Sequence, residues 1–167
     1  MIISLKGVDT TDLQLLARLA RDGRAQWSDL AAELAMSAPA IRDRVKRLER
    51  EGVITGYTAL LAPARLGLGL AAFVAVTLEH PRHRGGFLKR AGELAEVLEC
   101  HHIAGDDDYL LKVRCRGTAE LEKLVSEGLK GLAGVSRTRT TIVLSTSKET
   151  PVPPLPAGAA KPARRRR

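Results

Sequence analysis

Apolar residues at helical spacing predict three short helices at the start of the chain. Within residues 8–20, leucines and alanines recur every three or four positions, which is typical of an amphipathic helix with one buried stripe. Asp9 can cap this helix, and Asp12 follows where a carboxylate suits the positive end of the helix dipole. Gly23 is expected to stop the helix, and a second helix follows over residues 28–35.

The third helix has the clearest division between apolar and polar positions. Ser37 is expected to cap it, because the residue before a helix often accepts a hydrogen bond from a free backbone N–H. On a helical wheel, Val45 and Leu48 fall within about 40° of Ile41 and define the buried side. Because only a tight turn separates the last two helices, residues 1–52 predict a helix-turn-helix domain that is winged-helix-like.

From residue 53 the pattern changes. β-branched and aromatic residues predict a hinge strand and linker over residues 53–67, and residues 68–148 predict strands and helices in the order β-α-β-β-α-β. The expected elements are a buried strand at 70–79, a helix at 84–95, strands at 96–105 and 108–115, a helix at 118–132 and a strand at 134–146. This order is ferredoxin-like, so the fold class is α+β. Residues 149–167 are Pro-rich and basic, with too little apolar bulk to fold, and are expected to be a disordered tail.

Composition places the chain among soluble globular proteins. Hydrophobic residues make up 44% and charged residues 28% of the chain. No apolar run approaches the length of about 18 residues that a membrane span needs, and the first ten residues lack the pattern of a secretory signal. Two cysteines, Cys100 and Cys115, are too few for a disulfide scaffold and favour a reducing compartment. A cytoplasmic protein is therefore expected.

The formal net charge of +8 suggests a nucleic-acid partner, although most of the excess lies in the tail. Residues 1–60 carry a net charge of +1 and residues 61–150 a net charge of +2, whereas the last 17 residues have five cations and no acid. Whether the folded part is suited to bind nucleic acid therefore depends on where its cations lie and not on their total.

The third helix places its cations away from the apolar stripe. Lys46, Arg47 and Arg50 fall opposite the buried side, with Arg42 and Arg44 on the flanks. On a helix after a tight turn, such residues can reach base edges and phosphates. A solvated surface helix has a similar face, but the preceding helix carries no cation, which favours DNA contact, and Arg47 is assigned to the DNA with no buried partner. The predicted DNA-binding residues are Ser37, Pro39, Ala40, Arg42, Asp43, Arg44, Lys46, Arg47 and Arg50.

Three motifs in order resemble the Lrp/AsnC family of bacterial and archaeal transcription regulators. They are "LAAELAMSAPAIRDRVKRLEREGVITGYTALLAPARLGL", "IAGDDDYLLKVRCR" and "GVSRTRTTIVLSTSK", and the resemblance runs from about residue 8 to residue 148. It implies a DNA-binding helix-turn-helix with residues 37–49 as recognition helix, a hinge strand, and a ferredoxin-like domain that dimerises and often binds an amino acid. It further implies an obligate dimer that assembles into higher oligomers.

Two residues depart from the family pattern. Ala35 stands where many members have glycine, so a positive φ there would cost about 1 kcal/mol. Asp43 occupies a position of the recognition helix that is often basic or polar. It could accept a hydrogen bond from a cytosine amino group or pair with Arg47 four residues later, and the ion pair is favoured.

The motif "AGDDDYLL" is the candidate effector site. The resemblance places this loop near a cleft between neighbouring dimers where the effector binds. A carboxylate there could bind the ammonium of an amino acid, and Gly105 leaves backbone N–H groups accessible to its carboxylate. A solvated hairpin turn has the same composition. The predicted effector-binding residues are Gly105, Asp106, Asp107, Asp108 and Tyr109, with Thr140 and Ile142 on the last strand.

The remaining residues indicate neither a metal site nor an enzyme active site. Cys100, His102 and Cys115 offer three ligands where a closed zinc site needs four, so no metal and no cofactor is expected. The sequence shows no nucleophile–base constellation, so an enzyme is not expected. Two alternatives remain: an effector-independent architectural DNA-binding protein, and an enzyme like the sirohaem decarboxylases, which share this architecture.

Overall fold

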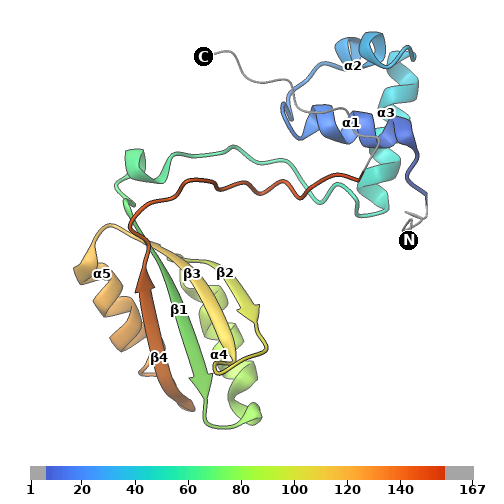
Figure 1. Cartoon of the computed structure of the whole chain (residues 1–167). Helices are drawn as coiled ribbons and strands as arrows, with labels where there is room; N and C mark the ends of the chain where they lie inside the picture. The colour runs from blue at the N-terminus through green and yellow to red at the C-terminus, as the bar shows by residue number, and fades with distance from the viewer. Residues whose placement is uncertain (1–6, 157–167) are drawn as a thin grey trace. The chain divides into compact units, whose positions relative to one another are not determined.

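The computed structural model describes residues 7–156 and consists of two compact units (Figure 1). One is formed by the chain up to Leu60 together with the segment that begins at Glu149, and the other by Leu61–Lys148. None of the helices in the described residues is long and apolar enough to cross a membrane.

The first unit contains helices α1 (Thr10–Leu19), α2 (Trp27–Glu33) and α3 (Ala38–Arg50). The predicted cap of α1 is confirmed as a capping box, because Asp9 and Asp12 each accept a hydrogen bond from the other's backbone N–H, at 2.8 and 2.9 Å. The helix ends at Leu19 and not at Gly23, because the backbone tightens into a turn there, with the N–H of Arg21 donating to the carbonyl of Arg18.

The core of the first unit is made of aliphatic side chains from all three helices. Ile41, Val45 and Leu48 are buried, as the wheel predicted, and they pack with Leu15 and Leu30. The predicted cap of α3 is also confirmed, since the Ser37 hydroxyl accepts from the backbone N–H of Ala40 at 3.3 Å. This core fixes which side of α3 remains outside.

The turn between α2 and α3 requires a left-handed residue. Ala35 has φ of 51° and is the only non-glycine residue with positive φ in the described part of the chain. The backbone N–H of Met36 then donates to the carbonyl of Ala31 at 2.9 Å, which closes the turn. Ala35 therefore adopts the left-handed conformation for which alanine, unlike glycine, is strained.

The second unit is a sheet of four antiparallel strands in the order β2-β3-β1-β4. Its elements are β1 (Leu70–Leu78), α4 (Arg84–Glu93), β2 (Val97–His102), β3 (Tyr109–Cys115), α5 (Thr118–Lys123), which continues as a π-helical turn (Leu124–Leu129), and β4 (Val135–Ile142), with short 3-10 turns at Pro63–Leu66 and Pro81–His83. The predicted β-α-β-β-α-β order is confirmed.

Both helices of this unit pack on one face of the sheet. Phe87 from α4 and Leu121 from α5 share a core with alternate residues of β1 and β3, such as Val74 and Leu111. The opposite face has no covering helix within the described residues. Phe73, on that face of β1, is 37% exposed.

Two connecting segments differ from what the sequence suggested. Residues 53–61, the predicted hinge strand, form no strand within this single chain, and their expected pairing with a second chain stays a prediction. Residues 151–156 were expected to be disordered, but they line a groove of the first unit. Of these six residues only Leu155 is half-buried, and the predicted disorder of the tail stays a prediction. Residues 157–167 lie outside the described residues.

Candidate DNA-binding surface and effector loop

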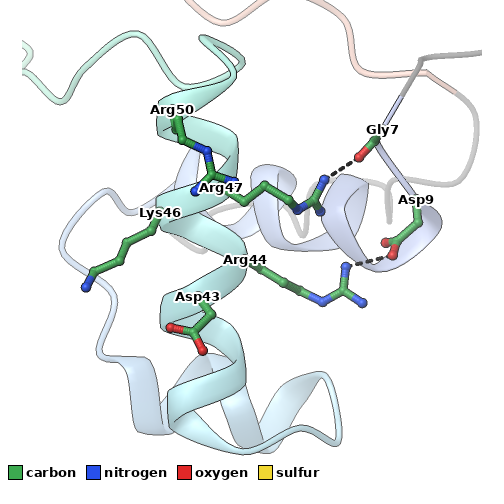
Figure 2. Close-up of a pocket in the computed structure, with 7 residues that line it drawn as sticks. All are labelled: Gly7, Asp9, Asp43, Arg44, Lys46, Arg47 and Arg50. Atoms are coloured by element: carbon green, nitrogen blue, oxygen red, sulfur yellow. Dashed lines mark hydrogen bonds and ion pairs between the residues drawn. The ribbon is translucent and has the colours of Figure 1, made fainter.

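A depression of about 710 Å³ opens beside α3 (Figure 2). Its lining residues are Gly7, Asp9, Asp43, Arg44, Lys46, Arg47 and Arg50. In Figure 2 the side chains of Arg44 and Arg47 extend toward the segment that leads into α1, whereas Lys46 points the other way. The cations of α3 therefore fall into two groups that have different surroundings.

The first group is bound to the fully buried carboxylate of Asp12. Its Oδ1 lies 2.8 Å from Arg44 Nη1, and its Oδ2 lies 2.6 Å from Arg47 Nη2. Arg44 Nη1 also lies 2.6 Å from Asp9 Oδ2, and Arg47 donates to the carbonyl of Gly7. The capping box of α1 thus doubles as the acceptor for two arginines of α3.

Burial and the neighbouring hydrogen bonds shift the pKa of Asp12 in opposite directions. Burial alone would raise its pKa, but the hydrogen bond from the Asp9 N–H and those from Arg47 and Arg44 together outweigh that effect and lower it. The same contacts raise the pKa of both arginines, for Arg44 chiefly through Asp9 and for Arg47 chiefly through Asp12. The network is therefore ionised at neutral pH and ties α3 to the start of α1.

This network corrects two predictions. Arg47 was expected to have no buried partner, which is wrong because it binds the buried Asp12. The favoured ion pair between Asp43 and Arg47 is also wrong, since Arg47 turns toward Asp12 and its contact four residues along is with Glu51, at 3.4 Å. Asp43 is exposed, and no partner for its carboxylate lies among residues 7–156.

The second group of polar side chains on α3 faces solvent. Arg42, Lys46 and Arg50 are exposed along the helix. At its start, Ser37 and Pro39 are exposed and Ala40 is half-buried, and the Ser37 hydroxyl is engaged as the cap. The predicted DNA-binding residues therefore share α3 and its cap, but only Arg44 and Arg47 bind Asp12, whereas Arg42, Lys46 and Arg50 have no ion pair with another residue of 7–156.

The predicted effector loop, residues 105–109, connects β2 to β3 and is anchored by Asp107. This carboxylate is 4% exposed and accepts from Thr77 Oγ1 at 2.9 Å, with Arg139 at 2.7 Å and Arg137 at 3.1 Å. The hydrogen bond from Thr77 and the two arginines lower the pKa of Asp107 in spite of burial. Asp107 therefore holds the loop against β1 and β4.

The other residues of the loop have distinct surroundings. Asp108 accepts from the backbone N–H of Leu78 at 2.7 Å. The ring of Tyr109 is buried, with its centroid 4.7 Å from that of Phe87, and its hydroxyl has no hydrogen-bond partner among residues 7–156. Asp106 is exposed, and within the same residues its carboxylate has no partner. Asp106 is thus the carboxylate of the loop that stays available to a ligand.

Thr140 and Ile142 lie farther along the edge strand β4. They pair with Val74 and Ala72 of β1, whereas the loop joins β1 near Thr77, so a single chain does not bring them to the loop. Sequence reasoning missed Arg137 and Arg139. Their period-2 spacing on a strand, which puts both on one face, was the available signal.

No group of three or more potential metal ligands is arranged to hold an ion in residues 7–156. Cys100 is exposed at the edge strand β2, whereas Cys115 is buried in the core of the second unit. Burial raises the pKa of both thiols. The geometry gives these cysteines and His102 no shared site.

Known proteins resemble both units. Residues 8–55 match the family model described as winged helix-turn-helix DNA-binding, and residues 71–153 match the one described as Lrp/AsnC ligand binding domain. The chain is 40% identical over 147 residues to the leucine-responsive regulatory protein of Haemophilus influenzae, which covers 87% of this chain and 89% of that protein.

Solved structures extend this similarity to the fold. A transcriptional regulator of Neisseria meningitidis in complex with L-Met has a TM-score of 0.84 at 31% identity, over 88% of this chain and 96% of that one. The feast or famine regulatory protein from M. tuberculosis, complexed with L-methionine, has a TM-score of 0.81 at 38% identity, over 89% and 99% of the two chains.

Proposed function

Because this chain belongs to the Lrp/AsnC family and is a DNA-binding transcription regulator with an amino-acid-binding domain, we propose how its residues divide the work. The exposed cations Arg42, Lys46 and Arg50 contact DNA, together with the start of α3. Arg44 and Arg47 instead fix the angle at which α3 is presented. This division rests on one observation: the buried carboxylate of Asp12 binds both Arg44 and Arg47, and so keeps these two side chains at the start of α1.

The geometry of α3 suits the major groove. Its exposed N-terminal residues are placed to reach base edges, and cations one and two turns later can meet phosphates. Asp43 has no partner in the folded chain and could accept from a cytosine amino group. Two such helices in a symmetric dimer would read two half-sites about one DNA turn apart.

The dimer itself is supported by the uncovered face of the sheet. Phe73 lies at its centre, and the neighbouring positions Lys112 and Thr141 belong to the flanking strands. A second copy of this face would remove the apolar side chains from water. The N–H groups of Val53 and Ile54 donate to the Leu48 carbonyl, whereas residues 55–61 make no backbone hydrogen bond with other described residues and could pair with the same segment of the partner.

An amino acid is the proposed effector, as two structural relatives were solved with L-methionine. We assign its ammonium to Asp106 and its carboxylate to backbone N–H groups near Gly105, on a loop that Asp107 keeps in place. Thr140 and Ile142 would reach that ligand only from a neighbouring chain. On this proposal the protein is a regulator and not an enzyme.

Titration of DNA binding against salt tests the division of α3. Lys46→Ala and Arg50→Ala should each weaken binding and reduce the slope of log affinity against log salt by about 1 per bound chain, or about 2 for the dimer, since each removes one phosphate contact from each chain. Arg116→Ala is the matched control, because Arg116 is exposed in the second unit. Unchanged slopes for both α3 variants would contradict the proposed interface.

A further inference from the structure

An apolar groove of about 500 Å³ lies in the first unit, and none of the described residues that line it belongs to α3. One wall is formed by Leu13, Leu16 and Leu19 of α1, and another by the segment from Val53 to Tyr57. The third wall comes from the far end of the chain, where Pro151–Pro156 lie along the groove. We call these six residues the docking segment.

The docking segment has the composition of a ligand for such a groove. Four of its six residues are prolines, whose fixed φ favours an extended conformation with little entropy left to lose. Leu155 is its one half-buried side chain. Tyr57 provides an aromatic wall, held by a hydrogen bond from its hydroxyl to Glu49 Oε1 at 2.9 Å. Proline-rich segments bind aromatic-lined grooves in this way.

We propose that the docking segment binds the first unit of its own chain and thereby holds the basic end of the chain at the DNA-binding unit. The sequence after Pro156 has 11 residues with five cations and no acid. Eleven residues span at most about 38 Å when fully extended, so docking keeps all five cations within that reach of the groove. Their partner is the phosphate backbone of DNA flanking the site that α3 reads.

The docking rests on the groove, whereas the role of the cations rests on the proposed DNA-binding function. The two are therefore tested separately. Trp27, the only tryptophan of the chain, lies in α2 and reports unfolding of the first unit by its fluorescence.

Leu155→Asp tests docking, because it places a charge in the apolar groove. It should lower the thermal midpoint of the Trp27 transition by about 4–8 °C, the shift expected when a domain of this size loses a modest apolar contact. Leu144→Asp is the matched control, since Leu144 is 96% exposed and should leave the midpoint unchanged. Equal midpoints for Leu155→Asp and the wild type would overturn the docking.

A photo-reactive residue identifies the chain to which the segment docks. Benzoylphenylalanine in place of Leu155 should cross-link on irradiation to α1 or to the peptide that contains Tyr57, in a product with the mass of one chain. A cross-link to those peptides found only in a two-chain product would overturn docking within the same chain.

Two further variants test the cations on a duplex without operator sequence. Replacing Lys161 and the four arginines at 164–167 by glutamine keeps the docking segment and should reduce the salt slope of binding by up to about 4.5 per bound chain. Residues 151–156 replaced by glycine and serine keep the cations but remove docking, and should reduce the slope by a smaller amount. A wild-type slope for the glycine–serine variant would show that the cations act without docking and overturn the proposal. If no variant and no wild type bound DNA, the DNA-binding function would fail while the Trp27 result stood.

Discussion

Replacing Asp12 by asparagine removes the charge that two arginines of α3 share but keeps an oxygen for the capping box. Arg44 and Arg47 would then face a neutral amide at a fully buried position. Breaking a fully buried ion pair costs about 3–5 kcal/mol, and the 27% exposure of both arginines reduces that figure. We therefore expect Asp12→Asn to lower the free energy of unfolding of the first unit by about 2 kcal/mol.

Urea titration followed by Trp27 fluorescence measures this change, with Asp43→Asn as the control because Asp43 is exposed on the same unit. The effect should depend on pH. The folded pKa of Asp12 is lowered from its ordinary value of 3.8, so its contribution is complete above that value and is lost as the pH falls through the lower folded pKa. The difference between wild type and Asp12→Asn should be constant from about pH 5 to 7 and shrink below about pH 4. A loss of less than about 0.5 kcal/mol at pH 7 would refute the reasoning.

Three other predictions concern single positions. Ala35→Gly should raise the free energy of unfolding of the first unit by about 0.5–1 kcal/mol in the same urea assay, since glycine adopts φ of 51° without strain, and a loss would contradict it. Phe73→Asp should convert the proposed dimer into single chains of 18.0 kDa by light scattering, because it charges the uncovered sheet face; an unchanged two-chain mass would exclude that face as the interface. Gly134→Ala should destabilise the second unit by at least about 1 kcal/mol, measured by circular dichroism, because φ is +87° there and the added Cβ would lie 2.0 Å from the His83 ring; full stability would show that the ring moves at no cost.

Local features of the fold followed from the sequence because they depend on neighbouring residues. The caps at Asp9 and Ser37 and the buried stripe of α3 each involve positions within a few residues of one another, whereas the question of a positive φ at Ala35 came only from the family resemblance. The helix predicted over residues 118–132 was less accurate. It becomes π-helical at Leu124–Leu129, where Gly128 packs against Leu94, and no local spacing signals that contact.

The candidate sites were harder to predict because their contacts join distant parts of the chain. Asp12 and Arg47 are 35 residues apart, and Asp107 and Arg139 are 32 apart. A helical wheel shows which side of α3 is outside but not which cations a carboxylate from another helix will bind. The composition of residues 149–167 likewise predicted that this segment does not fold alone. That prediction is compatible with residues 151–156 lying in a groove formed by other parts of the chain.

The groove of the first unit has a consequence for synthesis of the protein. Helices α1 to α3 are made before the second unit, but 93 residues separate Tyr57 from Pro151, where the last wall of the groove begins. At about 5–20 residues per second, the apolar side of α1 waits roughly 5–20 s for its cover. During that interval the whole second unit is made, so the groove of the DNA-binding unit is closed only after the second unit has left the ribosome.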